Sequence, residues 1–229
     1  IKNIIIKVTT NMKSNLSEIV YSNTSYKYSD KFFNENPGFD SRVSGGSSRY
    51  LSSSVFDKFP EVFLDEKPND GEKYSQIIGR QNNQRKTYYF KEKYLTPPEN
   101  YKSYKVLLAS SNGSGEFGEA LSTPIIGEPN VGSTETFVTI GNFDSKICAD
   151  NLIKYIKTKF YRAMLSTKKV TQGNKNSKVF ENIPLLDFSE SSDIPWDKSI
   201  NDIDNFLFSK FRLNENEIKF IVENVEEMK

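Results

Sequence analysis

The feature that most constrains the fold is a long amphipathic segment in the second half of the chain, from Ser145 to Lys169. Its apolar residues recur at helical spacing, and they are Leu152, Ile156, Phe160 and Ala163/Met164. This spacing predicts one long helix with an apolar side that faces a core. The cations spread over the rest of its circumference are Lys154, Lys157, Lys159 and Arg162. A helix of this kind buries its apolar side against another element, so the rest of the chain must supply one.

The first half and the middle of the chain contain segments typical of strands, because β-branched and aromatic residues are frequent in them. These segments are Ile4–Val8, Glu61–Leu64, Tyr74–Gly79, Lys86–Phe90, Tyr104–Ala109, Pro124–Ile126 and Thr136–Ile140. Asn15–Tyr21 is expected to form a short helix, and Tyr26–Ser54, rich in Ser, Asn and Gly, is expected to be a loop. Aromatic residues make up 13% of the chain, which is enough to build a core from large rings.

Two more helices are expected near the C-terminus, each with a capping residue at its start. Ser199 precedes one, with Asp202 three residues later, and Asn214 precedes the other, with Glu217 at the same spacing. Strand segments therefore come first and helices later, which predicts an α+β fold. We expect a mixed/antiparallel β-rich core with a long basic helix and a C-terminal helical pair.

The composition excludes several classes of functional site. The chain of 229 residues contains no histidine, which excludes Ser-His-Asp triads, histidine acid–base chemistry and most catalytic zinc sites. The single cysteine, Cys148, excludes an internal disulfide and favours a reducing compartment, so we expect a cytoplasmic protein. Neither a signal peptide nor an apolar run long enough for a bilayer is visible, so no membrane partner is expected. The chain begins with Ile1 rather than Met, and we expect it to be a piece of a longer protein.

The net charge of +1 hides three charged blocks of opposite sign. Residues 145–175 hold eight Lys/Arg against one acid, and residues 73–105 hold eight against two acids. Residues 181–229 hold twelve acids against five bases. Basic blocks indicate an anionic partner, although a solvated helix face accounts for many such runs as well.

From Tyr104 onward, the order of motifs resembles the C-terminal region of type II restriction enzymes in which a nuclease and an adenine-specific methyltransferase are fused to a recognition domain. The matching stretches are YKVLLASSNGSGEFGEALSTPIIGEP at Tyr104, ETFVTIGNFDS at Glu135, NLIKYIKTKFYRAMLSTKKVTQ at Asn151, IPLLDFS at Ile183, DIPWDKSINDID at Asp193 and FSKFRLNENEIKFI at Phe208. The last stretch is similar to the ending of TaqI-like specificity domains. There, Phe211-Arg212-Leu213 stands where the family usually has Tyr-Gly-Leu, a departure in a turn.

This resemblance implies a domain that recognises a DNA sequence and does not itself catalyse a reaction. The methyltransferase of such enzymes has an Asn/Asp-Pro-Pro-Tyr/Phe motif, whereas Pro97-Pro98 is preceded here by Thr96 and followed by Glu99. The implied partners are duplex DNA and the upstream methyltransferase and nuclease domains of the same polypeptide. S-adenosylmethionine and Mg²⁺ are expected for the parent enzyme and not for this chain. Residues 1–103 would form the N-terminal part with variable loops, and residues 104–229 the family-like specificity part, within one continuous domain.

Three segments carry side chains suited to DNA contact. In the expected hairpin tip, Arg can pair with guanine, and Asn or Gln with adenine, in the major groove. Asn112 lies in the glycine-rich stretch Asn112–Glu119, whose backbone could approach phosphates or be a structural turn. The segment after the basic helix carries donors of the kind that bind phosphates. The predicted DNA-binding residues are Arg80, Gln81, Asn82, Asn83, Gln84, Arg85, Lys86, Asn112, Lys168, Lys169, Thr171, Gln172, Asn174 and Lys175. No catalytic or metal-binding residue is predicted.

Two alternatives remain open from the sequence. Asp65-Glu66-Lys67 satisfies half of a restriction-nuclease signature, in which carboxylates hold Mg²⁺ and the lysine steadies the phosphate. The upstream acid of that signature is missing, because Asp57 is too close and Asp40 lies in an expected loop. In the second alternative, the acidic C-terminal helices dock a partner protein.

Overall fold

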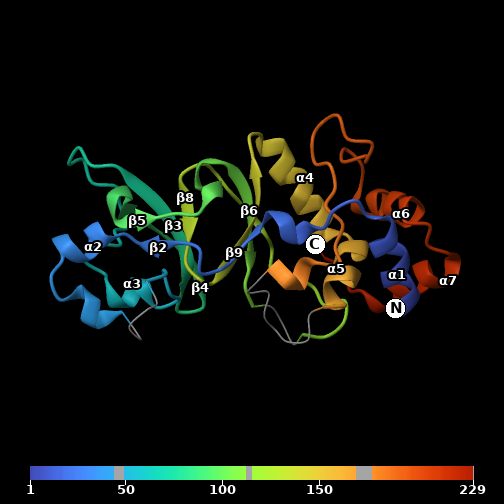
Figure 1. Ribbon diagram of the computed structural model, residues 1–229, viewed down its shortest axis with the longest axis horizontal. Helices are drawn as coiled ribbons and strands as arrows, with labels where there is room; N and C mark the ends of the chain where they lie inside the picture. Colours follow the sequence, from blue (N-terminus) through green and yellow to red (C-terminus); the bar gives the residue numbers. More distant parts are fainter. Residues whose placement is uncertain (44–48, 112–114, 169–176, 229) are drawn as a thin grey trace.

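A four-stranded antiparallel sheet forms the centre of the larger of two lobes. In the computed structural model, which describes residues 1–43, 49–111, 115–168 and 177–228, its strand order is β1-β9-β6-β7. These strands are β1 (Val20–Tyr21), β6 (Tyr104–Ala109), β7 (Ile125–Gly127) and β9 (Phe137–Phe143). Strands β6 and β9 are buried along most of their length rather than on alternate residues, so both of their faces are covered. Figure 1 shows helices on one side of this sheet and the smaller lobe on the other.

The predicted long helix is present as two shorter ones, so the expectation of a single helix over residues 145–169 is wrong. Helix α4 (Lys146–Lys157) ends at Thr158, and α5 (Lys159–Ser166) begins directly after it. The new N-terminus is capped by Thr158, whose hydroxyl accepts a hydrogen bond from the amide of Tyr161 at 3.1 Å. The carboxylate of Asp204 adds hydrogen bonds from the amides of Lys159 (2.9 Å) and Phe160 (2.8 Å). Burial raises the pKa of Asp204 to about 6. The apolar spacing survives the break, since the five predicted core positions are all buried.

Both predicted C-terminal helices are confirmed with their caps. Helix α6 (Ile200–Lys210) begins after Ser199, whose side chain accepts from the amide of Asp202. Helix α7 (Glu215–Asn224) begins with the reciprocal pair of Asn214 and Glu217.

The N-terminal segment predicted as a strand is a helix, α1 (Lys2–Asn11). Its β-branched residues favour a strand, but Ile4 and Val8 are four positions apart and both enter the larger core. Lys7 also forms an ion pair with Glu217 of α7 at 2.6 Å. Tertiary packing therefore decides the conformation of this segment. The short helix expected at Asn15–Tyr21 is a single 3-10 turn, Leu16–Ile19, followed by β1.

The smaller lobe is built around a hairpin of two eight-residue strands, β3 (Tyr74–Gln81) and β4 (Gln84–Lys91). A short strand that sequence patterns missed, β8 (Val131–Ser133), pairs in parallel with β3. The remaining elements of this lobe are β2 (Lys27–Tyr28), β5 (Leu95–Thr96), α2 (Asp30–Glu35), α3 (Val55–Lys58) and the 3-10 turns Phe39–Arg42, Glu92–Tyr94 and Glu99–Lys102. In the larger lobe, one further 3-10 turn covers Ser177–Phe180.

The core of the smaller lobe consists mainly of aromatic rings. It contains Tyr26, Tyr28, Phe32, Phe39, Phe56, Phe59, Phe63, Phe90, Tyr94 and Tyr101 with four aliphatic residues. Several of these rings come from residues 26–54, so the expectation of a plain loop there is wrong. Residues Glu61–Leu64 do not form a strand either, because only Leu64 bridges to the sheet, at Tyr89.

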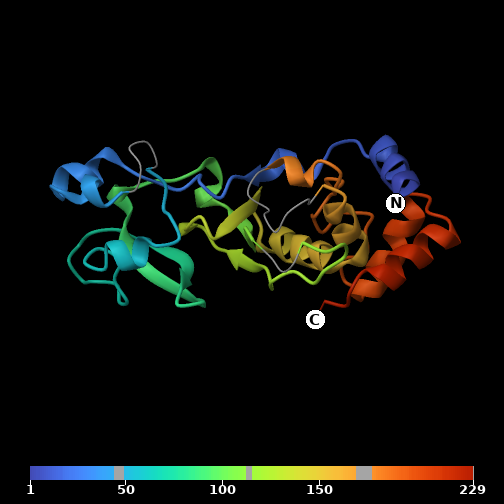
Figure 2. The ribbon, with the colours of Figure 1, turned by 90° about the horizontal axis from the view of Figure 1, so that it is seen from below.

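The α+β class is confirmed, and the molecule is elongated, with the two lobes side by side (Figures 1 and 2). The larger core includes Ile4, Val8 and Leu16 from the N-terminus, and the smaller core uses residues 26–101. The division of the chain at residues 103 and 104 stays a prediction. Within the described ranges, no helix combines the length and apolar character needed to cross a membrane.

The turn after α6 generates a prediction about stability. Arg212 has a φ of 55°, and the amide of Leu213 donates to the carbonyl of Phe208 at 2.9 Å, a geometry that usually places glycine at this position. Replacing Arg212→Gly should raise the free energy of unfolding by about 0.5–1 kcal/mol, because relief of left-handed strain exceeds the added freedom of the unfolded chain. Denaturant unfolding measures this change, and an unchanged or lower midpoint would contradict it.

Candidate nucleic-acid interface

The tip of the β3–β4 hairpin places an unbroken set of polar side chains in solvent. Gln81 pairs with Gln84 across the strands, so the loop contains only Asn82 and Asn83. From Arg80 to Thr87, every residue is exposed except the half-buried Gln81. No acidic residue occurs between Lys73 and Lys91. The tip is therefore a narrow antiparallel ribbon of donors and cations without an acid of its own.

Arg80 and Arg85 lie directly opposite each other in this ribbon. Opposite residues of an antiparallel pair share one face, and like charges at such positions lower stability. Within the part of the chain that the structure describes, neither arginine forms an ion pair with a carboxylate. Arg80 donates to the carbonyl of Asn83 at 3.0 Å, and Arg85 to that of Thr123 at 3.1 Å. The pair is unfavourable for folding and well placed to meet an anion.

The two asparagines at the tip are held by the turn itself. Asn82 has a φ of 50° and Asn83 a φ of 60°, the left-handed values of a two-residue hairpin loop. Asparagine tolerates this region better than other non-glycine residues. Both side chains are exposed, and their backbone is fixed by the strand pairing on either side. The tip thus offers two amide groups from a defined turn.

The other predicted residues of the hairpin differ in whether their side chains are engaged within the protein or exposed. Gln81 is engaged within the protein, since its amide donates to Asp57 at 2.6 Å and its oxygen accepts from Tyr88 at 2.6 Å. Gln84 and Lys86 are exposed. Sequence patterns missed three residues on the outer face with the arginines, namely Gln76, Thr87 and Tyr89. The alternation of exposed and buried residues along β3 was the signal that could have identified this face.

Hydrogen bonds link the ribbon to described residues near the other two predicted segments. Arg85 contacts Thr123, and the same connection reaches α5 through the amide of Gly118, which donates to Ser166 at 2.9 Å. Asn112, in this connection, lies outside the described residues, as do Lys169, Thr171, Gln172, Asn174 and Lys175. Their described neighbours, Ser111 and Lys168, are exposed. Residues 115–123 therefore contact both the ribbon, at Arg85, and the end of α5, at Ser166.

Four of the eight cations of the basic helical block are buried or paired within the protein. Arg162 is only 1% exposed, and Lys159 pairs with Glu227 at 3.0 Å. Lys154 donates to the carbonyl of Trp196, and Lys168 pairs with Glu181 at 2.9 Å. The charge of this block therefore overstates its free positive surface. For Lys168, a phosphate would have to compete with Glu181.

The block of residues 73–105 divides in the same way. Lys93 pairs with Glu35 and Glu72, and its hydrogen bonds lower the pKa of both carboxyls. Lys105 is fully buried, donates to the carbonyls of Tyr101, Ser103 and Glu128, and has its pKa lowered to about 8 by burial. These two lysines support the fold, whereas the cations of the ribbon tip are exposed, as are Lys73 and Lys102 at the two ends of the block.

The geometry of the described residues does not favour either of the two alternative sites. Asp65, Glu66 and Lys67 are exposed in a turn, and Asp57 is bound by Gln81. Among the described residues, no group of three His, Cys, Asp or Glu side chains could hold a metal ion. In the acidic C-terminal block, Asp204, Glu217 and Glu227 have partners within the protein. Nuclease activity and partner docking both stay predictions from sequence.

The glycine-rich connection generates the second prediction. Gly118 has a φ of 72°, and a Cβ there would lie 2.4 Å from the carbonyl oxygen of Asn224. Replacing Gly118→Ala should lower the free energy of unfolding by about 2–4 kcal/mol, through backbone strain and this clash. Gly71→Ala is the matched control, because Gly71 also has a positive φ but open space around it. Thermal unfolding of both variants tests this, and equal losses would contradict the clash.

Comparison with known proteins identifies no relative of this chain. No family model matches the chain, and no curated protein matches it. The resemblance to restriction–modification specificity domains therefore stays a prediction, and the functional argument depends on the ribbon and its surroundings.

Proposed function

We propose that this chain is the sequence-recognition module of a type II restriction–modification enzyme and binds duplex DNA without catalysing a reaction itself. The observation that carries the proposal is the opposed pair Arg80 and Arg85 at the tip of an acid-free ribbon. A two-stranded ribbon fits the major groove of B-form DNA. In that groove, arginine pairs with guanine and asparagine with adenine.

The geometry supports different roles for the residues at the end of the ribbon and for those behind it. Asn82 and Asn83 lie at its end, so they would reach furthest toward the base edges. Arg80 and Arg85 lie behind the Gln81–Gln84 pair and share one face of the ribbon, where guanine or phosphate is within range of a long side chain. Lys86 would add a phosphate contact from the other face. Specificity would come from the tip and affinity from the cations behind it.

In this proposal, methylation and cleavage belong to upstream domains of the same polypeptide, with S-adenosylmethionine and Mg²⁺ as their cofactors. The chain would act in the cytoplasm, where such enzymes meet DNA. The motifs from Tyr104 onward support the parentage, and the ribbon supports the contact with DNA.

The third prediction separates binding from folding. Arg80→Glu should weaken duplex binding and reduce the slope of log affinity against log salt by about one unit, because one phosphate contact is lost. The same change should leave stability equal or raise it by about 0.2–1 kcal/mol, since Glu would face Arg85 across the ribbon. Salt titration by fluorescence anisotropy and denaturant unfolding measure the two effects.

Lys219→Glu is the control for this experiment. Lys219 is an exposed cation on α7, away from the ribbon, with a side chain 71% exposed. This variant has the same change of charge, so it should leave the salt slope nearly unchanged. An equal loss of binding in both variants would reduce the effect to net charge and remove the ribbon from the proposal.

The fourth prediction concerns base reading. Asn83→Gly removes the amide while keeping a residue that readily adopts the turn, so the hairpin should persist. If Asn83 pairs with a base, the discrimination lost should be about 1–3 kcal/mol at one position of the site. Sequencing of the duplexes that the chain retains from a randomised pool would show this loss of discrimination as more than one base tolerated at that position. An unchanged site for both Asn83→Gly and Asn82→Gly would move base reading to other residues.

A further inference from the structure

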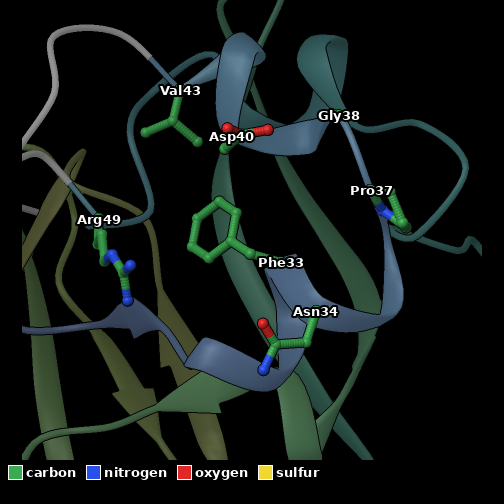
Figure 3. Close-up of a pocket in the computed structure, with 7 residues that line it drawn as sticks. All are labelled: Phe33, Asn34, Pro37, Gly38, Asp40, Val43 and Arg49. Carbon is green, nitrogen blue, oxygen red and sulfur yellow. The ribbon is translucent and has the colours of Figure 1, made fainter.

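A pocket at the outer end of the smaller lobe contains no residue of the ribbon. It lies between α2 and the 3-10 turn Phe39–Arg42 and has a volume of about 440 Å³ (Figure 3). That volume is within the range of small-molecule sites, about 300–1,000 Å³. Figures 1 and 2 place α2 at the end of the molecule remote from α6 and α7. A ligand here would therefore contact a region separate from the helical part of the protein.

An aromatic ring forms the centre of this pocket. Phe33 is half-buried, and its plane is fixed by edge-on contacts with Phe32 (5.0 Å between centroids) and Tyr28 (5.7 Å). The guanidinium of Arg49 lies 5.0 Å from the ring centroid and is itself paired with Asp30. Guanidinium groups stack on aromatic rings and on planar heterocycles alike. The pocket thus presents a fixed aromatic ring with a planar cation over it.

Two polar groups, a carboxylate and an amide, flank the ring. Figure 3 shows the carboxylate of Asp40 on one side of Phe33 and the amide of Asn34 on the other. Both residues are exposed, and among the described residues the structure records no hydrogen bond to either side chain. A carboxylate accepts from an exocyclic amino group, and an amide both donates and accepts. The matching ligand is flat, aromatic and carries donors and acceptors on its edge.

We propose that this pocket binds a single nucleobase that lies outside the base stack of a nucleic acid. The base would stack on Phe33, with its edge toward Asp40 or Asn34 and Arg49 beside it. Base–aromatic stacking is tolerant of sequence, so Phe33 would supply affinity and the flanking groups the preference among bases. The inference rests on the proposed function in making nucleic acid the ligand, but it uses different residues.

Three labelled duplexes test this inference with the whole chain. One is fully paired, the second carries one unpaired base in a bulge, and the third carries an abasic residue in the same bulge. The abasic duplex bends as a bulge does but has no ring to stack. By fluorescence anisotropy, the bulged base should bind about 5- to 100-fold more tightly than the abasic bulge.

Phe33→Leu should abolish this preference while keeping an apolar side chain of similar size. Phe206→Leu is the matched control, because Phe206 is also half-buried and has Lys210 over its ring at 5.6 Å, but lies on α6. The control should keep the full preference. If Phe33→Leu fails to fold in a thermal melt, Asp40→Asn takes its place, and it should change the order in which four bulged bases are preferred.

The outcomes distinguish this inference from the proposed function. Equal binding of the bulged base and the abasic bulge, with the paired duplex also bound, would overturn the pocket alone. A preference that survives Phe33→Leu, that is lost in Phe206→Leu, or that Asp40→Asn leaves in the same order would overturn it too. A preference that depends on Phe33, without any binding of the paired duplex, would support the pocket and overturn the ribbon proposal.

Discussion

The arrangement of the two lobes depends on the parallel pairing of β8 with β3. Strand β8 spans only Val131–Ser133, but it lies in the chain between β7 and β9, which both belong to the larger sheet. Its partner strand carries the ribbon. The pairing is close, because a Cβ on Gly132 would lie 2.9 Å from Ile77 and 3.0 Å from Tyr26. A hydrogen bond from Thr134 to Ile78 extends it, and one from Asn130 to Tyr101 joins the start of β8 to the turn Glu99–Lys102. The direction of the ribbon is thereby tied to the larger sheet.

Sequence patterns predicted the elements whose signals are local. The hairpin strands are rich in aromatic and β-branched residues, and the caps at Ser199 and Asn214 act over three residues, so both were correct. The failures depend at least in part on residues that lie far away in the chain. Strand β8 has only three residues and includes a glycine, which is rare in strands, and it forms because β3 pairs with it. The helix break has a local part, since Thr158 itself caps α5, but it is also stabilised by Asp204, which no pattern near residue 158 contains.

The residue types of the candidate site could be predicted from the sequence, but the amount of unpaired positive charge on the surface could not. Counting cations along the sequence gave two basic blocks and an acidic tail, and it could not show that these charges meet. In the fold, Lys159 meets Glu227 and Lys168 meets Glu181, so the tail neutralises part of the helical block. Among the described residues, no carboxylate pairs with the cations at the tip of the ribbon, whose strands pair with each other and contain no acid. The exposed tip was recognisable because its composition and its turn agree.

A ribbon with so few free cations has a consequence for how recognition would work. Each neutralised phosphate contributes a slope of about −0.9 in log affinity, and Arg80, Arg85 and Lys86 offer at most a few such contacts. Affinity of the isolated chain would then be weak and moderately sensitive to salt. A module linked to other DNA-binding domains needs no more, because the link raises its effective concentration at the site. Weak binding to the phosphates would in that case favour discrimination between sequences, because phosphate contacts add equally to the affinity for every sequence. The asparagines of the turn contribute only where a matching base lies opposite them.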